Sequence, residues 1–296
     1  MNERSIPVLL VSFNRPELTK KALDNLKLIE PPVIFFSVDG PRINNVKDKI
    51  KVLECRALAN EISWDCKIYV NFSDSNLGCG PWMVNSINWA FQYVSELLIL
   101  EDDVEISKEF YNSASHFVLS EEKNESIFAI CASNLSFERK IHSNRDYFKS
   151  VYFAGWGWAT WKSRWNAYDY EIIRNRKIDF LKLLKVNNFN PFIVLYFLLN
   201  FFLIRINKLS AWDYQVNYLM FLNNLYVVKP YRNLSRNFGD GDSATHTKFM
   251  PTFNIQEQQK DVRIVYDLEF DNSMDQIWRK SRILFLFKSF LKRYIG

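Results

Sequence analysis

The sequence predicts an α/β protein built on a Rossmann-like, mostly parallel sheet flanked by helices. Two observations predict this class. Four short apolar runs, at 6–13, 33–38, 67–72 and 97–100, each end in polar residues, as expected of buried strands. Stretches with apolar residues at helical spacing lie between these runs. This β-α-β-α alternation is typical of parallel strands joined by right-handed crossovers.

The helices follow from local signals. Pro16 suits a first helical position, a second helix is expected from about 46 to 62, and Pro81 opens a third. The side chains expected to face the core are Leu18, Ala22, Leu23, Leu26, Ile50, Leu53, Ala57, Leu58, Val84, Ile87, Phe91 and Val94.

Length and composition fit one large domain or a domain with an elaborated second lobe. The chain has 296 residues, 48% hydrophobic, with only eight glycines and nine prolines. We expect a first half of the domain at 1–134, a second half of the same domain at 135–270, and a tail at 271–296. Four scattered cysteines without a Cys-x-x-Cys pair indicate free thiols, and the first ten residues are too short for a signal-peptide core. A cytoplasmic enzyme is the expectation.

The basic character of the chain lies in its tail. Net charge is +5, but residues 276–296 alone carry six Lys and Arg and no acid, so the remainder is at −1. A nucleic-acid-binding domain is therefore not expected. On a helical wheel the tail has an apolar face and a basic face, which predicts an interfacial helix on an anionic membrane. The alternative is a helix packed on the protein with its cations in water.

Three consecutive carboxylates follow the fourth apolar run. Glu101, Asp102 and Asp103 repel one another, so folding alone gives no reason to place them at a buried strand end. A hard divalent cation, Mn²⁺ or Mg²⁺, supplies a reason, since it prefers oxygen ligands and can hold a diphosphate. The alternative is a solvated acidic turn.

The other strands also end in polar residues, and parallel strands bring their carboxyl ends to one edge of a sheet, where ligands bind. The side chains concerned are Ser12, Asn14, Arg15, Asp39, Asp74 and Asn76. No Gly-x-Gly-x-x-Gly follows the first strand and no P-loop occurs, so a dinucleotide site or a P-loop is disfavoured. We expect a nucleotide-sized cleft.

Residues 152–165 contain four tryptophans. Trp161 and Trp165 have helical spacing and are expected in the core, whereas Trp156 and Trp158, flanking Gly157, could equally pack or present a face to a sugar ring.

Three later features complete the set of candidates. Residues 191–204 are the most hydrophobic segment and are expected to form a core helix, with a membrane-dipping helix as the alternative. Asp213 follows Ser210 at the spacing of a capping box, which is compatible with a role as general base. His246, in a polar loop with glycines, could complete a manganese site, although a lone loop histidine is usually solvated.

Taken together, these motifs resemble those of nucleotide-sugar glycosyltransferases of the GT-A fold, particularly bacterial polysaccharide transferases related to the N-acetylglucosaminyltransferase I-like group. The resemblance covers about 6–246. It rests on Val-Ser-Phe-Asn-Arg-Pro (11–16), Ser-Val-Asp-Gly-Pro (37–41), Asn-Leu-Gly (76–78), Leu-Glu-Asp-Asp (100–103), Gly-Trp-Gly-Trp-Ala-Thr-Trp (155–161), Trp-Asp (212–213) and the loop ending at His246.

The resemblance implies a role for each matching residue. Arg15 and Asp39 would contact the base, Asp102 the ribose or donor sugar, and Asp103 with His246 the metal. Asp213 would be the catalytic base. The remaining site candidates are Ser12, Asn14, Asn76 and Gly78 for the nucleotide, and Glu101, Trp156, Gly157 and Trp158 for the donor or acceptor sugar.

The predicted function is metal-dependent, inverting transfer of a sugar from a UDP-sugar to a glycan acceptor. The acceptor is expected to be lipid-linked surface polysaccharide, such as O-antigen or capsule, at the inner face of the cell membrane. Two alternatives stay open: a sugar-nucleotide nucleotidyltransferase, and a non-catalytic membrane-associated scaffold with the same fold.

Overall fold

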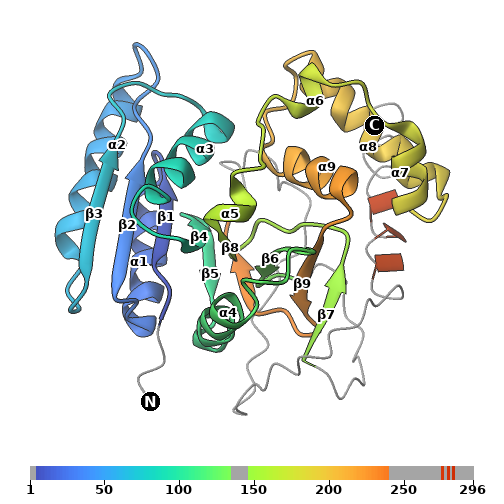
Figure 1. The fold of residues 1–296 in the computed structure, drawn as a ribbon. Coiled ribbons are helices and arrows are strands. Elements are labelled where there is room, and N and C mark those ends of the chain that lie inside the picture. Colours follow the sequence, from blue (N-terminus) through green and yellow to red (C-terminus); the bar gives the residue numbers. More distant parts are fainter. Residues whose placement is uncertain (1–4, 135–145, 240–274, 277–278, 281, 284–296) are drawn as a thin grey trace.

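An eight-stranded sheet runs through the molecule. The computed structural model describes residues 5–134, 146–239, 275–276, 279–280 and 282–283 (Figure 1). In spatial order the strands are β3 (Lys67–Phe72), β2 (Val33–Val38), β1 (Val8–Ser12), β4 (Glu96–Glu101), β8 (Trp158–Trp161), β6 (Ile127–Cys131), β9 (Tyr226–Pro230) and β7 (Tyr147–Ser150). The first four are mutually parallel, β8 is antiparallel to both neighbours, β6 and β9 are parallel, and β7 is antiparallel to β9. The predicted α/β class with a mostly parallel sheet is confirmed.

Helices bury both faces of this sheet. Alternate residues of β1 enter two cores: Leu9 and Val11 pack on one face, Val8 and Leu10 on the other. The first face is covered by α3 (Cys79–Ala90), α8 (Pro191–Arg205) and α9 (Asp213–Asn223), and the second by α1 (Pro16–Ile29), α2 (Val46–Ala57) and α4 (Lys108–Ser120). The result is a three-layer arrangement of helices, sheet and helices.

The predicted inner face of the segment 46–62 is wrong for Ile50, Leu53 and Ala57, whereas Leu58 is buried as predicted. Ile50 and Leu53 are 54% and 57% exposed, whereas Asp48, Val52 and Cys55 are buried. Asp48 can lie inside because it accepts hydrogen bonds from Asn14 and from the Arg42 guanidinium. The predicted segment 46–62 is divided, since a 3₁₀ turn (Leu58–Glu61) follows α2.

A second, two-stranded sheet places one loop against the end of β4. Here β5 (Val104–Ile106) pairs antiparallel with β10 (Ser235–Asn237), with Asn237 opposite Val104. The backbone N–H of Phe238 donates to the carbonyl of Asp103 at 2.8 Å. Residues far apart in the sequence are thereby brought to the acidic turn.

The helices α6 (Ile172–Asn175), α7 (Phe180–Val186) and the 15-residue α8 lie together near α9, whereas the short α5 (Lys162–Trp165) directly follows β8 (Figure 1). Asn190 caps α8 by accepting from the N–H groups of Phe192 and Ile193. The predicted helix at 191–204 is confirmed. No helix within the described ranges is both long and apolar enough to cross a bilayer.

Only five residues of the predicted tail helix at 276–296 lie in the described part of the chain. Arg279 is 4% exposed, and its guanidinium donates to the Tyr152 hydroxyl at 2.6 Å. Asp275, just before this segment, accepts from Ser150 at 2.6 Å. The turn containing Arg279 therefore packs on the protein, which corrects the expectation that this arginine faces lipid. Residues 284–296 lie outside the described residues.

Gly157 has a structural role. Its φ of +77° suits glycine, and an added Cβ would lie 2.6 Å from a methyl carbon of Ile106 and 3.3 Å from Cβ of Ala132. We expect Gly157→Ala to lower the free energy of unfolding by about 2–4 kcal/mol, because left-handed strain and overpacking add. Gly155→Ala is the control, since its Cβ would meet the Trp212 ring at 3.2 Å with no positive φ. Equal urea midpoints for the two variants would contradict this account.

Candidate functional site

The site is built around the acid triplet at the carboxyl end of β4. Glu101 is the last residue of that strand, and Asp102 and Asp103 form the turn into β5. The register of β1 and β4 places Val11 beside Glu101, so the end of β1 meets this turn. Asp102 is 3% exposed. The turn that contains Asp102 is therefore packed at the edge of the sheet and is not a solvated acidic turn.

Arg15, just after β1, pairs with two of the three acids. Its guanidinium forms an ion pair with Asp102, and its Nη1 lies 2.8 Å from Oδ2 of Asp103. Ser12 donates to Asp102 over 3.3 Å and shares a 2.6 Å hydrogen bond with Thr19. Arg15 and Ser12, both predicted nucleotide contacts, thus hold the acids in place from the neighbouring strand.

One arginine does not neutralise this cluster. Desolvation by burial raises the pKa of Glu101 to about 8, and the neighbouring Asp103, Asp102 and Asp213 add to this effect while Arg15 opposes it. Desolvation likewise raises the pKa of Asp102 to about 6, against the opposing effect of Arg15. Desolvation acts to lower the pKa of Arg15, but the two aspartates outweigh it and raise that pKa. Burial and mutual repulsion thus disfavour the ionised forms of Glu101 and Asp102, and a cation bound beside them would favour those ionised forms.

Asp213 belongs to the same electrostatic cluster. It contributes to the raised pKa of Glu101 and, with Glu101 and Asp103, to the raised pKa of the Cys79 thiol, for which desolvation is the main cause. Asp213 is the first residue of α9 with Trp212 as N-cap. The predicted capping box is therefore wrong, because Ser210 lies outside the helix. A carboxylate in the first turn is nevertheless favoured by the helix dipole.

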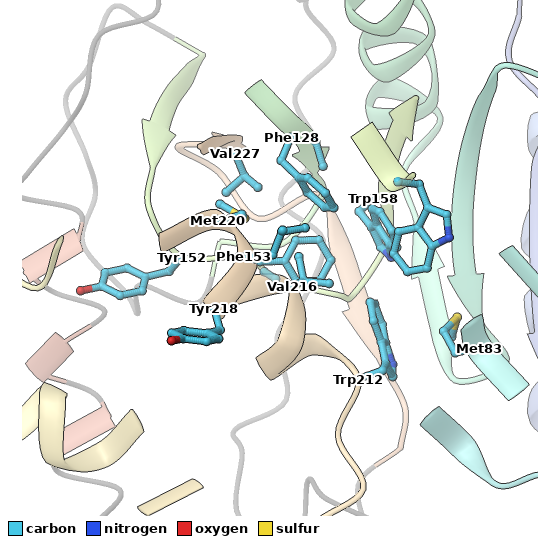
Figure 2. Packing of buried hydrophobic residues seen from close by; sticks show 14 of the residues in the cluster. Met83, Phe128, Tyr152, Phe153, Trp158, Trp212, Val216, Tyr218, Met220 and Val227 are labelled. Carbon is cyan, nitrogen blue, oxygen red and sulfur yellow. The ribbon is translucent and has the colours of Figure 1, made fainter. Parts of the chain in front are cut away.

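Buried tryptophans fix the start of α9. Trp158 has 0% exposure and lies between Phe128, Phe153 and Trp212, with its ring stacked on that of Trp212 at a centroid distance of 5.7 Å (Figure 2). The prediction that Trp158 contacts a sugar is therefore wrong, since no face of its ring is free. The buried Gly157 is likewise closed off by its packing against Ile106. Trp158 supports Trp212, the residue before the proposed base.

The aromatic stretch retains one candidate for a sugar contact. Trp156 is partly exposed and packs against residues of both cores. Trp161 and Trp165 are 1% and 3% exposed, which confirms that they belong to the core.

Asp39 organises the loop between β3 and α3. Its carboxylate accepts from the N–H groups of Gly40, Leu77 and Gly78 at 2.8–3.0 Å, and from Nδ2 of Asn76 at 2.8 Å. These four donors occupy the acceptor positions of the carboxylate. Asp39 and Asn76 therefore shape the loop ahead of α3, and the direct contact of Asp39 with a base stays a prediction.

Gly78 and Asn14 have different surroundings. Gly78 is the N-cap of α3 with φ of +85°, and nothing described lies within 4 Å of where its Cβ would be. Its backbone borders open space, as expected beside a ligand. Asn14 instead donates to Oδ1 of Asp48 at 2.7 Å, so its amide supports α2.

Asp103 has the surroundings expected of a cation ligand. A Cβ at Gly239 would lie 2.3 Å from Oδ2 of Asp103, so the space beside this carboxylate depends on glycine. Nδ2 of Asn237 donates to the other oxygen at 3.3 Å. The described ranges contain no group of three or more His, Cys, Asp or Glu side chains arranged to hold a metal ion. His246 lies outside the described residues.

The raised pKa of Glu101 predicts a pH-dependent stability. In the folded protein Glu101 stays protonated up to a pKa of about 8, whereas in the unfolded chain it loses its proton above the ordinary pKa of 4.5. The free energy of unfolding therefore falls as the pH rises from about 4.5 towards 8. The slope approaches about 1.4 kcal/mol per pH unit. Thermal unfolding should occur at lower temperature at pH 8.5 than at pH 5.5, and Glu101→Gln should reduce the difference. The same difference in both proteins would contradict the assignment.

The sequence analysis missed three residues of this site. Cys79 lies at the start of α3, and Asn237 and Gly239 approach Asp103 through the pairing of β10 with β5. Of these three, only Asn237 and Gly239 could have been suspected from the sequence, because they lie in the glycine-containing polar loop that also holds His246. The pairing itself joins residues more than 100 positions apart, which local patterns do not reveal.

No protein-family model matches the chain, and no curated protein matches it. Three solved structures share part of its fold. HddC from Yersinia pseudotuberculosis has 11% identity, covers 53% of this chain and 77% of its own, and has a TM-score of 0.30. A putative glucose-1-phosphate thymidylyltransferase from Bacillus anthracis, in complex with a sucrose, has 10% identity, covers 62% of this chain and 81% of its own, and has a TM-score of 0.31. The 4-diphosphocytidyl-2C-methyl-D-erythritol synthase from Anaerococcus prevotii has 9% identity, covers 58% of this chain and 79% of its own, and has a TM-score of 0.29.

The name of one neighbour, a thymidylyltransferase, is that of a nucleotidyltransferase, the class of the alternative prediction, rather than that of a glycosyltransferase. The neighbours show no likeness to the N-acetylglucosaminyltransferase I-like group in particular. At identities of 9–11% and TM-scores of 0.29–0.31 they carry no argument about the reaction. The reaction is therefore argued from the side chains of the site.

Proposed function

We propose that the chain is a glycosyltransferase that transfers a sugar from a UDP-sugar to a hydroxyl of a glycan acceptor. The observation that carries this proposal is the convergence of Asp102, Asp103, Arg15 and Asp213 at one strand end, with an excess of negative charge. Such a cluster suits a cation that holds a diphosphate, with a separate carboxylate for the acceptor.

Each residue has a stated role in this proposal. Asp103, with His246, would hold Mn²⁺ or Mg²⁺, and the bound ion would stabilise the negative charge that develops on the departing nucleoside diphosphate. Asp102 would face the ribose or donor sugar, and Glu101 and Trp156 would line the sugar site. Asp213 accepts the proton of the acceptor hydroxyl as its oxygen attacks the anomeric carbon, and the bond to the diphosphate breaks. A single displacement inverts that carbon.

The contacts of Arg15 are consistent with a nucleotide diphosphate and its cation binding beside Asp102 and Asp103. Arg15 already neutralises part of the negative charge of Asp102 and Asp103, from a position at the N-terminus of α1. A nucleotide diphosphate with its cation can replace this internal pairing without leaving the acids unpaired. A location at the inner face of the cell membrane, with a lipid-linked acceptor, belongs to the same proposal.

The nucleotidyltransferase alternative conflicts with the chain after β1. The first glycine in the sequence is Gly40, so no glycine-rich phosphate loop follows the first strand. Arg15, the residue closest to β1 that could hold a triphosphate, is turned towards the acids. This alternative would cleave a nucleoside triphosphate and release pyrophosphate.

Product analysis separates the two reactions. The protein is incubated with Mn²⁺ and a panel of UDP-sugars, with and without glycan acceptors, and in parallel with UTP and sugar 1-phosphates. We expect release of UDP from at least one UDP-sugar and no pyrophosphate from UTP. Pyrophosphate release without UDP release would refute the glycosyltransferase proposal. Neither product, with no binding of UDP, would favour the scaffold alternative.

A further inference from the structure

Helix α8 is apolar on all sides, and only one side packs inward. Its buried residues include Ile193, Val194, Phe197, Phe201 and Ile204. Along the opposite side, which we call the outer stripe, Phe192, Leu195, Leu199, Phe202 and Ile206 are 45–57% exposed. Their spacing alternates between three and four residues, so they lie on one helix face. Core packing explains the inner side but not the outer stripe.

The preceding helix enlarges this apolar surface. Phe180 and Leu181 in α7 are 50% and 68% exposed, and Phe189, between α7 and α8, is 68% exposed. The two helices lie together at the end of the molecule opposite β3 (Figure 1). Exposed apolar surface concentrated in this way marks an interaction site.

The surroundings of the outer stripe are strongly basic. From 172 to 209 the chain has seven Lys and Arg residues and a single acid, Asp179. None of the charged residues lies between 186 and 204, so the cations flank the apolar segment. Apolar side chains bordered by cations are typical of a helix at the surface of an anionic membrane, whereas a protein partner would not require this excess of one sign.

A shallow hollow at the carboxyl end of α8 gathers four of these cations. It has a volume of about 360 Å³ and is lined by Arg174, Asn175, Arg176, Lys177 and Arg205. Arg205 donates to the carbonyls of Ile173 and Arg176, at 2.8 and 2.6 Å, which ties α6 to α8. This fixes the backbone that carries Arg176 and Lys177.

Two of the lining cations are available to a ligand. Arg176 and Lys177 are exposed, and neither side chain forms an ion pair with an acid in the described part of the chain. Arg174, in contrast, pairs with Glu171 at 2.7 Å. The hollow therefore offers unpaired positive charge, of the kind that receives a phosphate group.

We propose that α7 and α8 form the membrane-docking face of this protein, with the outer stripe in the interfacial region of an anionic bilayer and lipid phosphates in the basic hollow. The 15-residue α8 is about 22 Å long, too short to span a hydrocarbon core of about 30 Å, so it lies in the plane of the interface. In this proposal the face formed by α7 and α8 takes the membrane-binding role that the sequence analysis gave to the tail, because the turn of the tail around Arg279 is buried.

The docking face adjoins the proposed active site. Residues 206–212 connect α8 directly to Asp213. Tyr170, four residues before Arg174, accepts from Gln215 of α9 through its carbonyl and lies against Gly80 of α3. If the proposed function holds, on which this step rests, a lipid-linked acceptor held at the interface would be presented to Asp213.

Vesicle flotation of the full chain tests the docking face. Vesicles of phosphatidylcholine alone are compared with vesicles containing phosphatidylglycerol, at low and high salt. We expect binding to the anionic vesicles only, weakened by salt. Arg176→Glu with Lys177→Glu should reduce binding about tenfold, as should Phe192→Ser with Phe202→Ser.

Matched controls lie on α2. Ile50 and Leu53 have exposures of 54% and 57%, equal to those of Phe192 and Phe202, so Ile50→Ser with Leu53→Ser should bind as the wild type does. Lys47→Glu with Lys49→Glu, also exposed, is the control for charge. UDP-sugar hydrolysis without acceptor is measured in every variant and should not change, which separates docking from the reaction.

Three outcomes would overturn the proposal. The first is wild-type protein that does not bind anionic vesicles. The second is binding that survives both pairs of substitutions, at Arg176 and Lys177 and at Phe192 and Phe202, which would assign the binding to another segment such as the tail. The third is a dimer in light scattering that Phe192→Ser with Phe202→Ser dissociates, since the outer stripe would then be covered by a second copy.

Discussion

Asp213→Asn should abolish sugar transfer while leaving donor binding nearly unchanged. The amide keeps the size and the position at the start of α9, but it cannot accept the proton of an acceptor hydroxyl. We expect kcat to fall about 10²–10⁴-fold. Titration calorimetry with UDP and Mn²⁺ should give a Kd within about threefold of that of the wild type.

A second carboxylate provides the control for this result. Asp179→Asn changes an acid that caps α7 by accepting from Lys182, so it alters a helix end without touching the site. It should keep full activity. Full activity of Asp213→Asn would exclude Asp213 as the base, and a lost affinity for UDP would instead assign it to the donor site.

Arg15→Gln should destabilise the protein more than any surface substitution. Without the guanidinium, the buried Asp102 and its neighbour Asp103 lose their ion-pair partner and keep only neutral donors such as Ser12 and Asn237. Breaking such a pair costs about 3–5 kcal/mol when fully buried, and Arg15 is 24% exposed, so we expect about 2–4 kcal/mol at pH 8. Urea unfolding measures the loss.

This effect should shrink at low pH. The pKa of Asp102 is already raised to about 6 with Arg15 present, so its protonation below that value removes the repulsion. Lys20→Gln breaks an exposed pair with Asp24 and is the control, with an expected change of less than about 1 kcal/mol. A midpoint for Arg15→Gln that equals the control at pH 8 would contradict the role given to Arg15.

Local sequence patterns predicted the strands of the first half because those patterns are set by burial. The strands β1, β2 and β3 lie within or coincide with the apolar runs identified in the sequence. The inner face of α2 was predicted wrongly, because counting apolar residues cannot reveal that Asp48 is buried by hydrogen bonds to Asn14 and Arg42. Apolar periodicity fails where polar side chains are satisfied inside.

The candidate site was predictable to the level of residue types at strand ends. Asp39 accepts hydrogen bonds from the loop 76–78, and Arg15 pairs with Asp102. Both contacts depend on how strands far apart in the sequence align. The aromatic stretch gave no means to separate Trp156 from Trp158, because β8, in which all four residues are buried, begins only at Trp158. Long-range register decided each of these points.

The central claim is that Asp103 binds a cation that holds the donor diphosphate. Crystals soaked with UDP and Mn²⁺ and measured at the manganese absorption edge test it most directly. We predict an anomalous peak about 2.1–2.2 Å from a carboxylate oxygen of Asp103, with the diphosphate bound to the same ion. A nucleotide bound away from Asp103, or a site there that stays without manganese at saturating UDP, would contradict it.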